Sequence, residues 1–498
     1  GGAATTSDSD LLFAQGPASL FADLSFWYQM EDGTLIMPDK RDDILIAFIQ
    51  KELGLAAPDI VFSLGRSRFG QSLGEWLQAA TGNGETAQTL DNAWRSFVYK
   101  RTAMAQQAPP APLPEQDIQL LCQIAGEERM ALYRYDLDTK TTVLEQPLNR
   151  YADKMVALPA DDGLAIWQTA EADAGATKLF LWHNEEMTEI SWDAVDDVPG
   201  SKPLHADLSR GKLILLPVNS EYGLLDVASC LGEACLLDSL AGYPIWSPDG
   251  VHMVMVDPSY EPSEPHQYGR LMLADGAGEL IRIFAFGASP FWLDNETFAF
   301  VSDEGEGSQH MIVTGQVDEE GYDWEVLLTV DQLTAVLNDT RTHWLDFVAP
   351  QPHDPDKLVI VTTTAEDNER TLFIYDLVTE ELLLALPFSD SNASGESYRF
   401  SPNGRFLLAQ YFEVDPNLQT QNSIYIIDLL DGSTSVKSLQ PFVGSSVYWH
   451  TDFSEDGDWL LIADEQMLYL SLPGSGYEQL IFPETGPCKT AVWVDKNS

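Results

Sequence analysis

Short apolar segments separated by turn residues recur along most of the chain. In the clearest copy, residues 243–257, apolar residues flank a turn formed by Ser247, Pro248, Asp249 and Gly250. Proline fixes φ at the second turn position, the aspartate side chain can accept a hydrogen bond from the nearby backbone, and glycine tolerates positive φ. This pattern predicts a β-hairpin with both faces mostly buried.

The same arrangement of apolar residues and turn recurs elsewhere in the sequence. Two further copies begin at Phe400–Gly404 and at Phe453–Gly457, and each is followed by an apolar segment. Degenerate copies occupy Leu204–Leu216 and Pro290–Ser302. Self-similarity at a regular spacing predicts an array of similar β-units.

These repeats resemble those of TolB-type and related WD-like β-propellers, whose blades carry a W-S-P-D-G turn between their first two strands. The resemblance covers about residues 117–494. It implies a mainly β propeller fold. Counting the strand and turn signals along the chain predicts eight blades of roughly 47 residues each. Seven blades are the alternative, because the second and third units carry weak signals. Propellers serve as scaffolds, binding platforms and enzymes, so the resemblance does not define an activity.

Residues 11–107 have a different period, typical of helices. The segment Asp42–Gly54 places its apolar residues on one helical face, and Gly70–Gly82 begins with the capping-box spacing of serine and glutamate. Thr89–Arg101 carries an apolar stripe and ends in basic residues. We therefore predict a small α-helical N-terminal domain.

Composition places the domain boundaries on either side of this helical region. Residues 1–10 are small and polar, which predicts a flexible lead, and residues 108–116 form a proline-rich linker. The remaining residues, 117–498, are assigned to the propeller, which we expect its C-terminal strand to close.

The last two predicted helices resemble the C-terminal helical part of gluzincin-type zinc peptidases. The matching residues are Ser72, Trp76, Leu77, Ala80, Thr81, Gly82, Leu90, Ala93, Trp94 and Phe97. The His-Glu-x-x-His zinc motif of that family does not occur, and His183 is the first histidine of the sequence. No catalytic residue carries over, so either the peptidase core lies upstream of residue 1 or the helical unit has been kept without it.

The formal net charge of −51, from 78 acidic and 27 basic residues, is extreme. Such a field repels nucleic acid and suits a solvated surface outside the cytoplasm, with a basic partner or a cation as the alternative explanation. The sequence contains no apolar segment of membrane-spanning length. It begins without methionine, which we interpret as a processed or truncated form. We expect a bacterial protein that is periplasmic, cell-surface or secreted. A lipidated cysteine before Gly1 would make it a lipoprotein.

Four cysteines, Cys122, Cys230, Cys235 and Cys488, allow three pairings. An even, sparse set in an exported acidic protein favours two disulfides, with four free thiols as the alternative. The first blade lacks an inner strand, while residues 488–494 supply a strand without partners. Pairing these strands brings Cys122 to Cys488 and leaves Cys230 to pair with Cys235.

Several patterns imitate catalytic or metal sites but fit structural roles better. Ser72 lies in a G-x-S-x-G pattern, but it is also a helix N-cap, and the parallel sheet that a nucleophile elbow needs is not predicted. Asp452 begins a calcium-like loop that ends in Ala463 instead of glutamate. Residues 303–307 are better interpreted as an exposed acidic turn than as a cation site. His343 and His353 flank prolines and cannot share a helix, which disfavours a metal site.

We therefore assign no catalytic, cofactor-binding or metal-ligating residue from the sequence, with loop-bound calcium left open. The sequence favours a non-catalytic extracytoplasmic propeller that binds a protein or ligand or serves as a structural or assembly subunit. The alternative is the C-terminal portion of a zinc-peptidase-related protein. The ligand, the oligomeric state and the organism are not encoded in any recognisable pattern.

Overall fold

The computed structural model describes residues 109–496 with gaps, the longest of which are 169–177, 191–202, 227–235, 258–268, 303–310 and 440–449. Before residue 109 it describes a short hairpin, β1 (Gln29–Glu31) with β2 (Thr34–Ile36), and a few helical residues. The chain divides into two compact units. One contains residues 1–155, 441–454 and 459–497, and the other contains residues 156–440 and 455–458.

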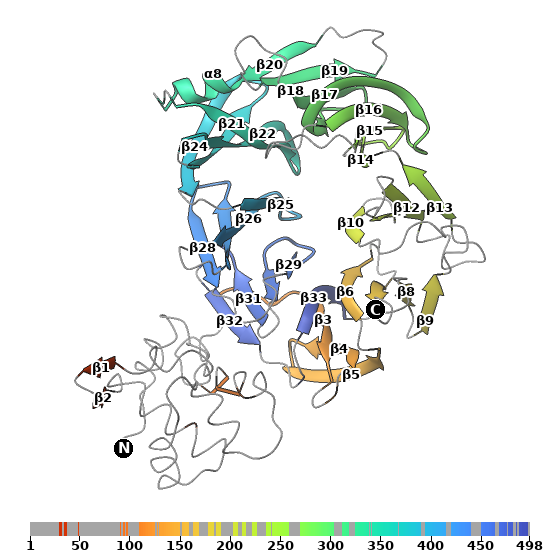
Figure 1. The fold of residues 1–498 in the computed structure, drawn as a ribbon, viewed down its shortest axis with the longest axis vertical. Coiled ribbons are helices and arrows are strands. Elements are labelled where there is room, and N and C mark those ends of the chain that lie inside the picture. Colours follow the sequence, from red (N-terminus) through yellow and green to blue (C-terminus); the bar gives the residue numbers. More distant parts are fainter. Residues whose placement is uncertain are drawn as a thin grey trace. The chain divides into compact units, whose positions relative to one another are not determined.

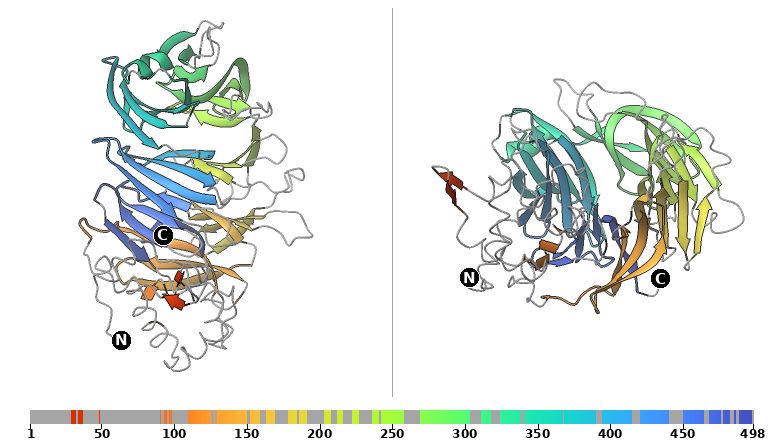
Figure 2. Two further views of the ribbon diagram at one scale, coloured as in Figure 1. Left: turned by 60° about the vertical axis from the view of Figure 1, so that its left-hand side comes forward. Right: turned by 60° about the horizontal axis from the view of Figure 1, so that its bottom comes forward.

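The described part of residues 109–498 is built from consecutive antiparallel sheets, six of four strands and one of seven (Figure 1). Within most sheets the strands follow each other in chain order, each paired to the next. This order, repeated from sheet to sheet, is that of β-propeller blades. The twist of the strands within each sheet is visible in Figure 2. The fold is therefore mainly β and propeller-like, as the repeats predict.

The first unit contains two four-stranded sheets. One has the order β33-β3-β4-β5, with β3 (Gln116–Gln123), β4 (Met130–Asp136), β5 (Thr141–Pro147) and β33 (Cys488–Asp495). The other comprises β29 (His450–Phe453), β30 (Leu460–Ala463), β31 (Leu468–Leu472) and β32 (Tyr477–Ile481). Side chains from both sheets form one apolar core that includes Ile118, Leu120, Leu461, Leu470 and Trp493.

The last strand of the chain completes the sheet that begins with the first described strand after the linker. β33 pairs antiparallel with β3 from Gln116 opposite Asp495 to Cys122 opposite Cys488. These two cysteines form a disulfide across 366 residues of sequence. The disulfide predicted from the strand accounting is therefore confirmed, whereas Cys230 and Cys235 lie outside the described residues.

The second unit starts within β6 and holds five sheets. The first three are β6 (Ala152–Ala157), β7 (Leu164–Gln168), β8 (Lys178–His183) and β9 (Glu186–Ile190); then β10 (Pro203–Asp207), β11 (Lys212–Leu215), β12 (Tyr222–Asp226) and β13 (Leu236–Leu240); then β14 (Tyr243–Trp246), β15 (His252–Asp257), β16 (Gly269–Asp275), β17 (Leu280–Trp292), β18 (Thr297–Ser302), β19 (Met311–Gln316) and β20 (Glu325–Thr329). A short helix, α8 (Val330–Ala335), follows. The last two sheets are β21 (His343–Gln351), β22 (Asp354–Thr364), β23 (Arg370–Asp376) and β24 (Glu381–Ser389); and β25 (Ser394–Phe400), β26 (Phe406–Val414), β27 (Thr420–Asp428) and β28 (Thr434–Leu439).

The central strands of these sheets are buried on both faces because a neighbouring sheet covers each face. In β22, Leu358 and Ile360 belong to an apolar cluster shared with β18, whereas Val359 and Val361 belong to one shared with β26. Alternate residues of a strand point to opposite faces, so both sets must be apolar. This is the physical reason for the uninterrupted apolar segments in the sequence.

The predicted turn chemistry is present at the serine-containing turns. Gly250 has a φ of 76°, and the Asp249 carboxylate accepts hydrogen bonds from Ser247 Oγ at 2.8 Å and the Val251 amide at 3.0 Å. The buried serine hydroxyl also accepts a bond from the amide of His252 at 3.0 Å. The expectation of burial fails at Val251, which is 55% exposed because it lies at the turn and not in the following strand.

Turns of successive sheets also bond to one another. The side chains of Gln351 and His353 reach the backbone oxygens of Gly404 and Pro402, at 2.7 and 2.8 Å. The Asn403 amide group donates in turn to the backbone oxygen of Asp456 at 2.9 Å. The backbones approach so closely that a Cβ atom on Gly404 would lie 2.2 Å from the Pro352 oxygen. Glycine at this turn is therefore required by packing as well as by its φ of +69°.

Few of the residues in the predicted helical region are described. Phe48, Leu90, Trp94 and Phe97 are helical and buried, and the Phe48 ring lies 5.4 Å from both the Trp94 and the Phe97 rings. Ala93 and Ser96 are also helical and partly buried, and the other residues of the three predicted helices, Ser72 included, lie outside the described residues. Within the described part of the chain, no helix is long and apolar enough to cross a membrane.

We predict that replacing both Cys122 and Cys488 with serine lowers the free energy of unfolding. The chain-entropy treatment of a loop this long gives about 6 kcal/mol, and engineered disulfides suggest about 2 to 4 kcal/mol. Denaturant titration of the double variant and of the wild type, with and without reductant, measures the loss. With reductant the two proteins should be equally stable, and equal stability of the variant and the wild type without reductant would contradict the prediction.

A second prediction separates backbone conformation from packing at the turns. Gly404 and Gly432 both have positive φ, but the nearest atom to a Cβ on Gly432, in Leu384, is 3.3 Å away. Gly432→Ala should therefore cost only the left-handed backbone term, about 1–2 kcal/mol. Gly404→Ala should cost about 1–3 kcal/mol more because the Pro352 backbone must also move. Thermal unfolding of both variants tests this, and equal losses would show that the contact between the turns is unimportant.

Candidate functional site

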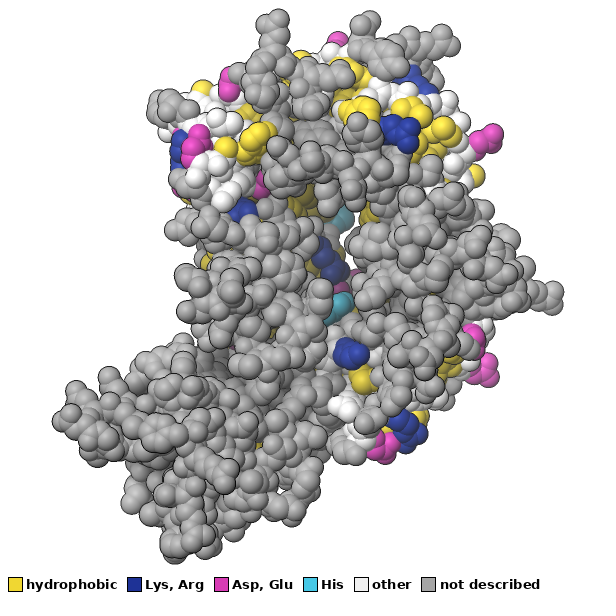
Figure 3. Space-filling view, viewed as in Figure 1, with side chains coloured by type: hydrophobic (Ala, Val, Ile, Leu, Met, Phe, Trp, Pro, Cys, Tyr) yellow, Lys and Arg dark blue, Asp and Glu magenta, His cyan; other side chains and the backbone are white. Residues whose placement is uncertain are grey.

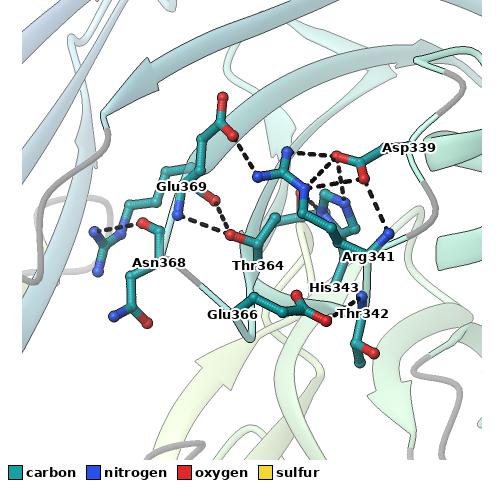
Figure 4. A network of polar contacts seen from close by, with 10 residues as sticks. Asp339, Arg341, Thr342, His343, Thr364, Glu366, Asn368 and Glu369 are labelled. Atoms are coloured by element: carbon teal, nitrogen blue, oxygen red, sulfur yellow. Dashed lines mark hydrogen bonds and ion pairs between the residues drawn. The ribbon is translucent and has the colours of Figure 1, made fainter.

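Charged and polar side chains gather at one end of the sheet β21–β24. In the register of the sheet, His343 at the start of β21 faces Thr364 at the end of β22, and Arg370 at the start of β23 faces Thr363 and Ser389. Antiparallel order brings the beginnings of two strands and the ends of the other two to the same edge. Segments far apart in the sequence are therefore joined at this end, shown in Figure 4.

Local turn chemistry shapes both connections at this edge. Before β21, Thr329 and Gln332 form a capping box that starts α8. Between β22 and β23, the Thr364 hydroxyl accepts a hydrogen bond from the Glu369 amide at 2.8 Å, and Asn368 adopts a φ of 57°. Asparagine tolerates this left-handed conformation better than most residues. Side-chain hydrogen bonds thus fix the two segments that carry the charged residues.

Arg341 links these two segments. Its guanidinium contacts both Asp339 oxygens, with the shortest distance 2.6 Å, and it also reaches Glu369 at 2.7 Å. The hydrogen bonds that Arg341 donates hold the pKa of the Asp339 carboxyl well below its usual range. The same two carboxylates raise the pKa of Arg341. The arrangement is a guanidinium shared by two carboxylates, with the Arg341 side chain 34% and Glu369 32% exposed.

His343 lies beneath this pair and is almost fully buried. Its Nε2 is 3.2 Å from the Asp339 carboxylate, and its Nδ1 is 3.3 Å from the Thr362 hydroxyl. The Thr342 amide next to it donates to Glu366 at 3.3 Å. The imidazole and the Arg341 guanidinium thus both lie against the Asp339 carboxylate (Figure 4).

A second ion pair lies in the interior next to this edge. Arg370 Nε is 3.8 Å from the Asp346 carboxylate, and both side chains are 2% exposed. The Arg370 guanidinium also stacks 4.3 Å over the ring of Tyr411 in β26, and the Tyr411 hydroxyl lies 2.9 Å from that of Tyr398 in β25. Asp346 further accepts a hydrogen bond from Thr363. The charges thus tie sheet β21–β24 to sheet β25–β28.

These contacts suit holding and presenting charge more than a bond-making reaction. The Asp339 and Asp346 carboxylates accept hydrogen bonds from Arg341 and Thr363 respectively. Glu366, Glu369 and Arg341 meanwhile keep part of their surface in solvent. Side chains positioned by neighbours on rigid strands lose little entropy when they bind a partner. The chemistry of the edge is that of a preorganised, mixed-charge contact surface.

Several residues singled out in the sequence have structural roles. Asp452 accepts a hydrogen bond from the Trp493 amide at 3.1 Å, Ser454 accepts one from Trp459, and Asp456 accepts one from Asp458. The calcium-like pattern is therefore a blade turn, as its alternative interpretation predicts. Across the described residues, no group of three or more His, Cys, Asp or Glu is arranged to hold a metal. The acidic turn at 303–307 lies outside them.

The two histidines considered for a metal site are separated by the length of β21. His343 begins the strand, whereas His353 lies in the turn that follows it and contacts Pro402. Sequence reasoning picked out His343 but missed its partners Asp339 and Arg341, and it missed Arg370 with Asp346. A signal was available, because charged residues bracket both ends of the predicted apolar strands around residues 339–346 and 366–370.

Comparison with known proteins indicates similarity at the level of fold only. No protein-family model matches the sequence, and no curated protein matches it significantly. Among solved structures, AztD from Citrobacter koseri is 12% identical with a TM-score of 0.42, over 76% of this chain and 98% of that one. An oligogalacturonate lyase from Vibrio parahaemolyticus is 12% identical with a TM-score of 0.44, over 69% and 97%.

TolB from Acinetobacter baumannii is 14% identical with a TM-score of 0.30, over 69% of this chain and 82% of that one. All three TM-scores lie below 0.5, so none of these similarities carries a shared activity, ligand or site to this chain.

The depressed pKa of Asp339 predicts a measurable dependence of stability on pH. Because the unfolded state binds the proton first, stability from this group is present above the ordinary aspartate pKa of about 4 and is lost as pH falls. Arg341→Gln should therefore flatten the fall in unfolding free energy between about pH 5 and about pH 2. Denaturant titrations across this range measure it. Arg129→Gln, at an exposed ion pair, is the control, and identical slopes for both variants would contradict the prediction.

Proposed function

We propose that this chain is a non-catalytic extracytoplasmic module, built on an eight-bladed propeller, that binds a protein or ligand through the polar edge of sheet β21–β24. Eight blades follow if the seven-stranded sheet is counted as two units that share β17. The first half of that strand pairs with β16 and the second half with β18. The remaining six sheets each supply one unit.

The cellular compartment is supported by the disulfide. Cys122 and Cys488 are buried and join strands from opposite ends of the described sequence. Stable disulfides of this kind persist in oxidising surroundings such as the periplasm or the cell exterior. The net charge of −51 is consistent with a solvated protein in such a compartment and disfavours nucleic acid as the partner.

The observation that carries the binding role is the preorganised charge at the edge of β21–β24. Two carboxylates, Asp339 and Glu369, contact the Arg341 guanidinium, and a third, Glu366, accepts a hydrogen bond from the Thr342 amide. The excess of negative charge favours a partner that presents a lysine or arginine at this position. Such a partner would also be attracted over longer distances by the acidic chain as a whole.

A second candidate function rests on the aromatic cluster of Phe48, Trp94 and Phe97. Its helical, buried residues coincide with two of the positions that resemble zinc-peptidase helices. In this alternative, the chain is the C-terminal portion of a zinc-peptidase-related protein. A His-Glu-x-x-His motif in the upstream reading frame would favour it, whereas a lipobox cysteine directly before residue 1 would exclude it.

The proposed function predicts selective loss of partners when the edge is neutralised. Glu366→Gln/Glu369→Gln should retain at least about fivefold less of a specific partner than wild type in affinity capture from the source organism's envelope fraction. Quantitative mass spectrometry measures the difference. Glu127→Gln, at an exposed glutamate in the first unit, is the control. Identical capture by wild type and the double variant would contradict the proposed surface.

The proposed absence of catalytic activity is tested by incubating the purified chain with peptide and ester substrates. We expect no hydrolysis above background. Proteolysis that a chelator abolishes, or ester hydrolysis that Ser72→Ala abolishes, would overturn it.

A further inference from the structure

The first half of β17 exposes an unusual set of large apolar side chains. Leu280, Ile281, Ile283 and Phe286 are 49%, 51%, 47% and 40% exposed, whereas no other described strand exposes more than two such residues. Figure 3 shows hydrophobic side chains gathered at the place that β16 and β17 occupy in Figure 1, with a Lys or Arg side chain among them. Clustered exposed apolar residues mark surfaces that contact a partner.

This half of β17 is also an open edge of its sheet. It pairs with β16 on one side, whereas pairing with β18 on the other side starts only at Ala288. Within the described residues, Leu280–Gly287 therefore has one ladder partner. An edge strand presents backbone N–H and C=O groups in the direction of the missing strand, and these groups can bond an added strand.

The charge of the edge is opposite to that of the chain. Residues 280–292 contain no Asp or Glu and carry Arg282, in a protein with 78 acidic residues. Arg282 Nη2 donates to the Gln316 backbone oxygen at 2.6 Å, and its Nε is buried and has no hydrogen-bond acceptor among the described residues. A strand added here would meet an apolar surface with one guanidinium beside it.

A second copy of this chain fits the edge poorly. Antiparallel pairing centred on Ile283 would place Arg282 diagonally across from the same residue of the other copy, about 7–8 Å away. The two copies would also repel each other, since each carries a formal charge of −51. The charge pattern therefore favours a different protein as the occupant.

We propose that the edge Leu280–Gly287 binds an extended segment of a partner protein by β-strand addition. The segment has apolar side chains at alternate positions, which cover Ile281 and Ile283. It carries a single carboxylate where it passes Arg282 and is otherwise free of acidic residues, because the acidic chain repels them. This surface is distinct from the polar edge of β21–β24, so either site can fail its test without the other.

The test uses the full chain and a labelled synthetic peptide that alternates valine and threonine and has one glutamate at its centre. Fluorescence anisotropy measures its dissociation constant. We expect saturable binding that is lost when alternate peptide nitrogens are methylated, because methylation removes the ladder donors. Ile281→Ser/Ile283→Ser should weaken binding by about tenfold or more. Val436→Ser, at a 48% exposed valine of the outer strand β28, should leave it unchanged.

One protein variant and one peptide variant test the predicted ion pair between Arg282 and the glutamate of the peptide. Arg282→Gln should raise the dissociation constant of the glutamate peptide by about three- to tenfold. The dissociation constant of a peptide with glutamine in place of the glutamate should not change. Thermal unfolding confirms that each variant is folded. Absence of peptide binding, equal binding of the methylated peptide, or equal binding by Ile281→Ser/Ile283→Ser would overturn the proposal. So would a dimer, detected by sedimentation, that the same double substitution dissolves, since the occupant would then be a second copy.

Discussion

The pairing of β3 with β33 is the constraint on which the first unit depends. Without β33, β3 would be an uncovered sheet edge, and the apolar residues of both strands would lose the core that they share with β30 and β31. The pairing must also overcome the entropy of closing a very long loop, which rises only with the logarithm of loop length. The main-chain hydrogen bonds of the β3–β33 pair offset part of this entropy cost. The disulfide reduces the cost itself, because the cross-link lowers the entropy of the unfolded chain.

Contacts between sheets in the second unit are mostly apolar, but polar contacts fix their alignment. The side chains of β22 pack against a sheet on each face, and such apolar contacts tolerate small sliding movements. The Arg370–Asp346 pair and the Tyr411 ring do not, because a buried charge that loses its partner costs about 3–5 kcal/mol. We interpret this pair as a device for alignment more than for net stability. The hydrogen bonds between turns at Gly404 and Asn403 act in the same direction.

β17 shows how one strand can serve two sheets and leave an edge open. Gly287 lies where the strand passes from β16 to β18, and a Cβ there would be 2.6 Å from the Phe300 ring. Close approach at this glycine lets the second half of the strand enter the next sheet. The first half then lacks a strand on its other side among the described residues, and its exposed apolar residues follow from this geometry.

The sequence alone determined the repeated units, their turns and the closing disulfide. These features follow from short stretches of sequence or from counting strands. A serine-containing turn requires particular residues at fixed positions, and a strand buried on both faces requires an uninterrupted apolar segment. An unpaired strand at one end of the array requires the unpaired strand at the other end as its partner. Only the tertiary structure decided the polar edge of β21–β24. Glu369 belongs to a different connection from Asp339 and Arg341, and Arg370 meets Tyr411 of another sheet. Their proximity depends on strand register and on the stacking of sheets, which a one-residue shift would change completely and which no local pattern records.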